Sequence, residues 1–322
     1  MKTSSQEQPE SPVMQWLLDS DPSIRWQVLR DLTGGSDAEV AAERAKVATQ
    51  GWGAQLLALQ GEDGSWAGEA WNHGWNSTMH VLSLLREMGL DPAGEATRRA
   101  LGLVRDHVHW RGWDGDGTWH GADFVGNLFF AGEVEPCING QVAASGAYFG
   151  QDVERIIGRL LGEQMEDGGW NCEQENGSRR GSFHTTICVL EALLEYERAG
   201  GRQSGVTDAR LRGQEYLLER GLLRRKTTGE IIDPAWTQFS FPTWWHYDVL
   251  RGLEYLRRAG VTPDKRMVEA IELVELKRDG EGRWSLENRH PGTMPVEMEH
   301  EGQPSRWNTL RALRVLNWYS AR

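Results

Sequence analysis

The chain is short of positive charge, and this shortage limits the partners it can bind. Of its 322 residues, 35 are lysine or arginine and 47 are aspartate or glutamate, which gives a net charge of −12. Nucleic acids and anionic membrane surfaces bind to basic patches. We therefore expect neither as a partner, and expect instead an apolar neutral or cationic small molecule.

Long apolar runs are also missing. No segment approaches the roughly 20 apolar residues that cross a bilayer, and the polar residues 1–10 do not resemble a secretory signal. We therefore expect a soluble cytoplasmic protein without a membrane span. Cysteine is scarce and odd in number, with only Cys137, Cys172 and Cys188. In a reducing compartment, metal binding or simple burial is a better explanation for these thiols than a disulfide.

Nothing in the sequence marks a boundary between domains. A hydrophobic content of 39% is enough for a core, and no change of charge and no linker interrupts the chain. We predict one domain over residues 12–322, preceded by a disordered tail over residues 1–11.

Tryptophan is the residue in excess, with 16 copies, and part of this excess belongs to an internal repeat. A turn of an acidic residue, glycine, one variable residue and tryptophan occurs four times. The first three copies are about 50 residues apart and the last follows at about twice that distance, which predicts a degenerate fifth copy near residues 224–234. The four turns are Asp63-Gly64-Ser65-Trp66, Asp116-Gly117-Thr118-Trp119, Asp167-Gly168-Gly169-Trp170 and Glu281-Gly282-Arg283-Trp284.

Each turn separates two kinds of helix. The helix before a turn has one apolar stripe and one charged face, whereas the helix after it is apolar or small on nearly every side. We predict outer helices near 37–59, 93–109, 151–166, 207–222 and 264–278, and inner helices near 22–32, 75–89, 138–149, 183–199, 243–259 and 305–319. The first and last inner helices have similar sequences and lack the polar face of a solenoid cap, so we predict a closed all-α ring, a single α/α toroid.

The segments Gln164–Asn171 and Gln60–Trp66 resemble the Gln/Trp repeat of squalene and oxidosqualene cyclases and of protein prenyltransferase β subunits. The resemblance covers about residues 12–320 and implies an α/α toroid around an apolar cavity. It also implies an isoprenoid or comparable apolar substrate. The Asp-x-Asp-Asp acid of the cyclases is absent, and the nearest string, Asp114–Gly117, belongs to a repeat turn.

The zinc site of the prenyltransferases is the closer resemblance. Their Asp-x-Cys corresponds here to Glu135 and Cys137, their histidine ligand corresponds to His184, and Cys172 lies in the loop between. Carboxylate, thiolate and imidazole are suitable zinc ligands, and three protein ligands leave a position for a substrate thiol or water. We therefore expect a zinc site at these four residues. Cys188 is expected to pack in the core instead.

The prenyltransferases hold a diphosphate with basic residues before the Asp-x-Cys, but residues 129–134 contain no cation here. We expect Arg179 and Arg180 to bind the anion in their place. Aromatic residues at the starts of inner helices predict a ring of cavity-lining side chains that would stabilise a cation. These are Trp75, Phe183, Trp244, Trp245, Tyr247 and Trp307.

Three further side chains are candidates for acid–base chemistry: His246, Asp248 and Asp123. The leading interpretation is a zinc-dependent enzyme of the terpene cyclase or prenyltransferase type. One alternative is a carbohydrate-active α/α barrel that uses paired carboxylates among Asp123, Asp233 and Asp248. Another is a helical-repeat protein that binds a ligand without catalysis.

Overall fold

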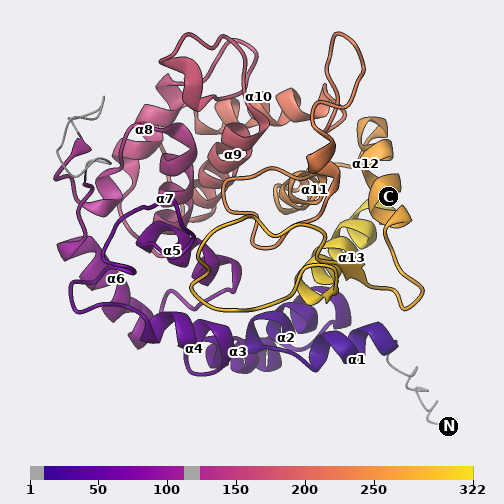
Figure 1. Ribbon diagram of the computed structural model, residues 1–322, viewed down its shortest axis with the longest axis horizontal. Coiled ribbons are helices and arrows are strands. Elements are labelled where there is room, and N and C mark those ends of the chain that lie inside the picture. The colour runs from indigo at the N-terminus through magenta and orange to yellow at the C-terminus, as the bar shows by residue number, and fades with distance from the viewer. Residues whose placement is uncertain (1–10, 112–123, 322) are drawn as a thin grey trace.

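Helices in two concentric layers make up nearly all of the regular structure (Figure 1). The computed structural model describes residues 11–111 and 124–321. The inner layer consists of α2 (Pro22–Val28), α5 (Thr78–Glu87), α7 (Pro136–Tyr148), α9 (Phe183–Arg198), α11 (Val249–Arg258) and α13 (Arg306–Ser320). The outer layer consists of α1 (Pro12–Leu18), α3 (Asp37–Ala45), α4 (Gly51–Ala58), α6 (Glu95–His107), α8 (Glu154–Gly162), α10 (Val206–Leu218) and α12 (Val268–Leu276).

Short elements complete this arrangement. One π turn, η1 (Leu29–Thr33), extends α2. The single-turn helices are η2 (Lys46–Ala48), η4 (Phe129–Ala131), η5 (Cys172–Gln174), η6 (Pro234–Thr237) and η7 (Lys265–Met267). Strands β1 (Trp284–Ser285) and β2 (Pro304–Ser305) pair antiparallel, with Trp284 opposite Ser305. No helix within the described ranges is both long enough and apolar enough to cross a membrane.

The inner layer closes on itself, so the fold is an α/α toroid, as predicted. The Arg314 guanidinium of α13 donates to Gln27 Oε1 of α2 at 2.7 Å and forms an ion pair with Asp31. On the other side of α2, Trp26 Nε1 donates to the Met88 carbonyl after α5 at 2.8 Å. The first and last inner helices are therefore neighbours, and Figure 1 shows α13 beside α2.

The repeated tryptophan turns join the two layers in the same way at each described copy. The indole N–H groups of Trp66, Trp170 and Trp284 each donate at 2.7 Å to a carbonyl of the preceding outer helix. Their backbone N–H groups each donate to a threonine hydroxyl of the following inner helix, at 3.0 to 3.1 Å. The turn glycines Gly64 and Gly168 have φ of +81° and +87°, which favours glycine. The copy at residues 116–119 lies outside the described residues.

Helices α7 and α9 pack closely because α7 turns a small residue, Gly140, toward α9. A Cβ atom added at Gly140 would lie 2.7 Å from the backbone of Cys188. The absence of a side chain at Gly140 therefore permits the two backbones to approach closely.

The helices differ from the sequence predictions in three places. The inner helix expected from residue 243 begins only at Val249, because the Asp248 side chain caps it by accepting from the Arg251 N–H. Residues 243–248 form an irregular loop in which Trp244 has a φ of +51°. Helix α1 was not predicted as a separate element. The single outer helix expected near 37–59 is divided into α3 and α4, with η2 between them.

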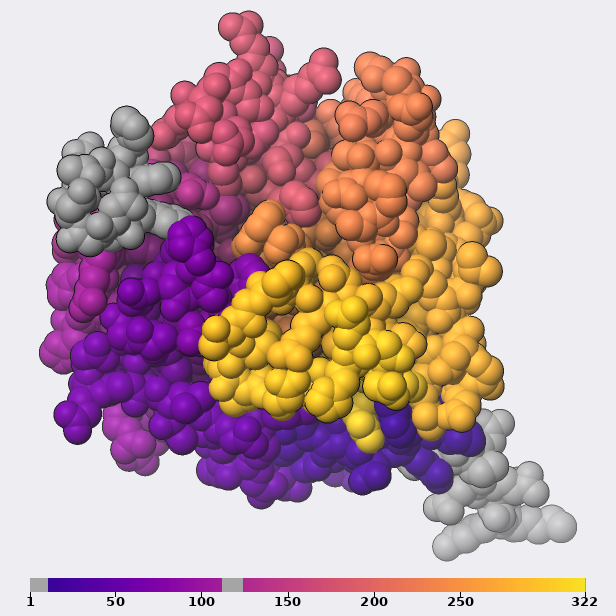
Figure 2. All heavy atoms as spheres, viewed as in Figure 1, coloured from indigo at the N-terminus to yellow at the C-terminus, as the bar shows by residue number. Residues whose placement is uncertain are grey.

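The long connections run from outer to inner helices and gather at one end of the ring, here called the loop end. The inner-to-outer connections are short and lie at the opposite end, here called the short-turn end. Figure 2 shows the loop end, where residues near 285–304, in yellow, lie across the middle of the face. The loop-end segments in the described chain are 59–77, 108–111, 124–135, 163–182, 219–248 and 277–305.

Candidate functional site

Two thiols and a carboxylate meet at the loop end, at the start of α7. One ligand atom from each of Glu135, Cys137 and Cys172 lies within 4.8 Å of those of the other two. The Cys137 Sγ lies 3.6 Å from Glu135 Oε2. Glu135 is the N-cap residue of α7, and Pro136 fixes the first turn, so the carboxylate and the Cys137 thiol are adjacent. The Cys172 thiol raises the pKa of Cys137 well above its usual range, and burial adds to this effect.

Cys172 reaches this cluster because it lies two residues after Trp170, the last residue of the third repeat turn. It begins the single-turn helix η5, which Asn171 caps by accepting from the Glu173 N–H. The Cys172 Sγ lies 3.4 Å from the Thr185 hydroxyl of α9. Glu135 and Cys172 line a cavity of about 240 Å³ together with Glu163 and further polar residues. The cluster therefore faces an acidic cavity, which favours a cation.

His184, the fourth expected zinc ligand, is not part of this cluster. Its Nδ1 accepts from the Tyr247 backbone N–H at 2.8 Å. Its ring packs edge-on against Trp245 and Trp236, with centroids 5.2 and 5.6 Å away. The structure thus brings three of the four expected ligands together and places His184 in the neighbouring aromatic group. Cys188 is fully buried in the core, as expected.

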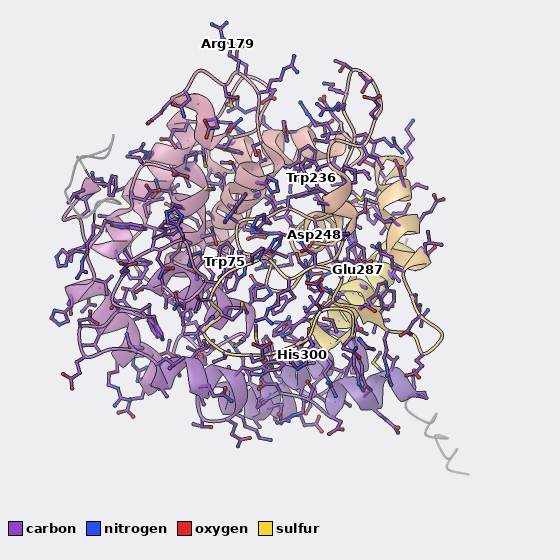
Figure 3. The ribbon with its side chains drawn as sticks, viewed as in Figure 1. Trp75, Arg179, Trp236, Asp248, Glu287 and His300 are labelled. Atoms are coloured by element: carbon purple, nitrogen blue, oxygen red, sulfur yellow. The ribbon has the colours of Figure 1, made fainter. Side chains whose placement is uncertain are left out.

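The aromatic residues expected around a cavity gather at the loop end, where they mostly pack against one another. Trp75 stacks on Trp244 with centroids 5.2 Å apart, and Phe183 meets Tyr247 edge-on at 4.9 Å. Trp307 stacks on Phe241 at 4.2 Å, on a different side of the ring. Figure 3 shows Trp75, Trp236 and Asp248 grouped toward the middle of this face.

His246 and Asp248 are linked through residues that the sequence did not single out. Asp248 is buried, and its Oδ2 accepts from the Ser240 hydroxyl at 3.1 Å. The same hydroxyl lies 3.2 Å from Nε2 of His290, and the His290 ring stacks on His246 with centroids 3.7 Å apart. Ser240 and His290 come from separate loops, so no local sequence signal could have found them.

The histidines of this group stay neutral at physiological pH. Burial lowers the pKa of His246 to about 2, with contributions from His290, His184 and Arg251. Burial likewise lowers the pKa of His290 to about 4. Imidazoles with pKa values this low accept protons poorly near pH 7. These histidines are therefore better suited to packing and hydrogen bonding than to general base catalysis at that pH.

The other expected site residues lie apart. Arg179 and Arg180 are exposed, and Figure 3 shows Arg179 at the outer edge of the molecule, pointing away from the ring. Asp233 caps η6 by accepting from the Ala235 N–H. Asp123 lies outside the described residues.

The centre of the ring differs from the expected apolar cavity. A small space of about 50 Å³ at the centre is lined by Phe241 and Trp244 on one side, but also by Glu191, Arg251 and Arg311. These charged side chains are buried and paired across the inner helices. The Arg251 guanidinium donates to both Glu191 carboxylate oxygens, at 2.8 and 2.9 Å.

A second cavity at the loop end is lined by aromatic residues and by polar ones, one of which is a buried acid. It has a volume of about 210 Å³, and its lining includes Trp71, Trp110, Phe124 and Glu133. Burial raises the pKa of Glu133 to about 8. The apolar sequence around Glu133 gave no sign that this carboxyl would be buried beside a cavity.

The stability of the protein is expected to fall as the pH is lowered from 7 to 5. His80 is fully buried, and burial lowers its pKa from 6.5 to about 3. In this pH range the unfolded chain binds a proton at His80 and the folded chain does not. This difference lowers the free energy of unfolding by about 2 kcal/mol at pH 5. Urea denaturation of the wild type and of His80→Gln at both pH values tests this. Equal losses in the two proteins would contradict it.

Comparison with known proteins gives a likeness in fold. No protein-family model matches the chain, and no curated protein matches it. Among solved structures, it is similar to the type II terpene cyclase MstE from Scytonema, determined in complex with its substrate geranylgeranyl dihydroxybenzoate. The two sequences are 14% identical, the match covers 98% of this chain and 89% of that chain, and the TM-score is 0.44. At this level the likeness concerns the helical architecture alone.

Proposed function

We propose that the protein is a metal-dependent enzyme of the terpene cyclase or prenyltransferase type, with zinc bound by Glu135, Cys137 and Cys172. The observation that carries the proposal is the convergence of two thiols and a carboxylate from separate segments beside one cavity. An isoprenoid or comparable apolar substrate is the partner that the aromatic cavity near Glu133 favours.

The donor set fits zinc in chemistry, and the distance between Cys137 and Glu135 fits zinc in spacing. Zinc binds thiolate sulfur at about 2.3 Å and carboxylate oxygen at about 2.0–2.2 Å in a tetrahedral arrangement, which places such a sulfur and oxygen about 3.6 Å apart. The Cys137 Sγ and Glu135 Oε2 atoms are 3.6 Å apart. Three protein ligands would leave one position open, as in catalytic zinc sites.

Some residues around the cluster would hold the metal ligands in position, and others would bind the substrate. Zinc, when bound, would supply a thiolate or hydroxide nucleophile at neutral pH. Thr185 holds the Cys172 side chain through its hydroxyl, and Pro136 fixes the turn that carries Glu135 and Cys137. Trp110 and Phe124 supply apolar surface for the substrate on the other side of the start of α7. His246 and Asp248 would act as positioning residues, because Asp248 is occupied as a helix cap.

Zinc content is the direct test of the metal site. Wild-type protein, purified without chelator, is expected to contain close to one zinc per chain, measured by inductively coupled plasma mass spectrometry. Cys137→Ser and Cys172→Ser are each expected to lose most of it. Mutating a residue that only hydrogen-bonds to a metal ligand typically lowers metal affinity by about 10–100-fold, and removing a ligand itself should cost at least as much. Cys188→Ala is the matched control, since this buried thiol is not one of the three clustered ligands and instead contacts the Trp245 carbonyl and Arg251.

Two results would refute the metal site. One is wild-type protein that folds normally and binds no zinc when dialysed against it. The other is equal zinc loss in Cys188→Ala and Cys137→Ser, which would show that the metal responds to general disruption and not to its ligands. Circular dichroism spectra of each variant confirm that the helical fold is intact.

A further inference from the structure

A positively charged cavity lies at the short-turn end of the ring, opposite the metal cluster. It has a volume of about 490 Å³. Within the described chain, its lining contains seven arginines and four carboxylates, an excess of three positive charges. The protein as a whole has a net charge of −12, so this concentration of arginine runs against the overall composition. A cavity with this charge favours an anion.

Ion pairs within the lining neutralise only part of this charge. Arg257 binds both carboxylate oxygens of Glu254, at 2.9 and 2.8 Å. Arg198 and Arg258 share the single carboxylate of Glu195. Two guanidinium groups therefore compete for one carboxylate, and part of the positive charge stays available to a ligand.

Arg44 contributes a guanidinium without a carboxylate partner among the described residues. Its Nε donates to the Gly89 carbonyl at 2.7 Å and its Nη2 to the Tyr148 hydroxyl at 2.9 Å. Its guanidinium also lies over the ring of Trp26, 5.3 Å from the centroid. These neutral contacts fix the orientation of Arg44 and leave its charge uncompensated.

Arg86 is the buried side chain that points most clearly to a ligand. It is 7% exposed and lines both this cavity and the small space at the ring centre. Its Nη2 lies 2.8 Å from Glu87 Oε1 and 3.6 Å from Glu191 Oε2. Its Nε and Nη1 are buried without a hydrogen-bond partner in the described chain, as is Nε of Arg314, which also lines this cavity. Buried donors without partners are costly, so a group that accepts from them would stabilise the site.

We propose that this cavity binds a small organic phosphate or diphosphate, with Arg86 and Arg44 as its principal ligands. Guanidinium groups bind phosphate oxygens through paired, charge-assisted hydrogen bonds. An excess of three charges matches an anion that carries two or three negative charges. The site is separate from the proposed zinc cluster and does not depend on it.

Isothermal titration calorimetry of the full chain with pyrophosphate, at low ionic strength, tests the proposal. Saturable binding is expected, with affinity that falls as sodium chloride is added. Arg86→Gln and Arg44→Gln are each expected to weaken it at least about 10-fold, since each removes a charged hydrogen-bond donor. Arg179→Gln is the control, because Arg179 is exposed at the loop end. Cys137→Ser should bind pyrophosphate as the wild type does, even if it loses zinc.

Two results would overturn the proposal. One is the absence of saturable binding by the folded wild type at millimolar pyrophosphate. The other is binding that Arg44→Gln leaves unchanged. Arg44 is only partly buried, so this variant should keep its fold and decides the question even if Arg86→Gln unfolds. A melting curve for each variant establishes that the fold is retained.

Discussion

Replacing Arg251 with methionine is expected to lower the free energy of unfolding by about 3–5 kcal/mol, because it removes the nearest cation from the buried Glu191 carboxylate and leaves it with the more distant Arg86, 3.6 Å away. Arg251 is 6% exposed and Glu191 is 8% exposed. Burial opposes ionisation of Glu191, but the Arg251 guanidinium outweighs it and lowers the pKa of that carboxyl to about 2. Glu191 is therefore charged in the folded protein at pH 7, and urea denaturation at that pH measures the loss.

Arg251 also holds the loop that carries much of the aromatic group. Its Nη1 donates to the carbonyls of Trp244 and His246, at 2.9 and 2.6 Å. The near-ultraviolet circular dichroism of the tryptophans should therefore weaken in Arg251→Met. This spectral change separates loss of the loop from a uniform loss of stability.

A double variant separates the ion pair from the rest of the arginine's contacts. Glu191→Leu combined with Arg251→Met removes both charges, so it should recover part of the stability that Arg251→Met loses. The recovery should be incomplete, because the two loop carbonyls remain without their donor. A loss below about 1 kcal/mol in Arg251→Met alone would contradict the expected cost of removing the nearest cation from a buried carboxylate.

The ring architecture could be predicted because the tryptophan turns recur with the same residue types as well as at regular spacing. Trp66, Trp170 and Trp284 each donate to a carbonyl and a threonine hydroxyl at equivalent positions, so the three described copies join the same kind of helix pair. The start of α11 was placed too early because the apolar pattern continues through residues 243–248. The Ser240 hydroxyl, eight residues earlier, donates a hydrogen bond to Asp248. This contact fixes the end of the loop at Asp248, and it is visible only in the structure.

The candidate site was harder to predict because its contacts cross long stretches of chain. Glu135 and Cys137 are neighbours in sequence, so their proximity follows from one turn of helix. His290 reaches Ser240 from a loop 50 residues away, and sequence spacing carries no information on such a contact. The charged ring centre was missed for a related reason. A helical pattern cannot show whether Arg251 faces water or a glutamate on another helix.

Replacing Trp170 with alanine is the second change for which we expect a loss of about 3–5 kcal/mol, the usual cost of removing a large aromatic side chain from a core. Trp170 is fully buried. It packs so closely against α10 that a Cβ atom at Gly213 would lie 2.8 Å from its indole ring. Neighbouring backbone cannot easily fill the space left by the indole, so a cavity should remain.

Trp170→Phe distinguishes the hydrogen bond of the indole from its packing. Phenylalanine keeps most of the ring but leaves the Leu160 carbonyl without its 2.7 Å donor, so we expect a loss of about 1–3 kcal/mol. Leu276→Ala is the surface control, because Leu276 is 83% exposed and should change stability by less than about 0.5 kcal/mol. Urea denaturation of the three variants gives the comparison. If Trp170→Ala lost no more than Leu276→Ala, the repeated tryptophans could not be what holds each inner helix to its outer partner.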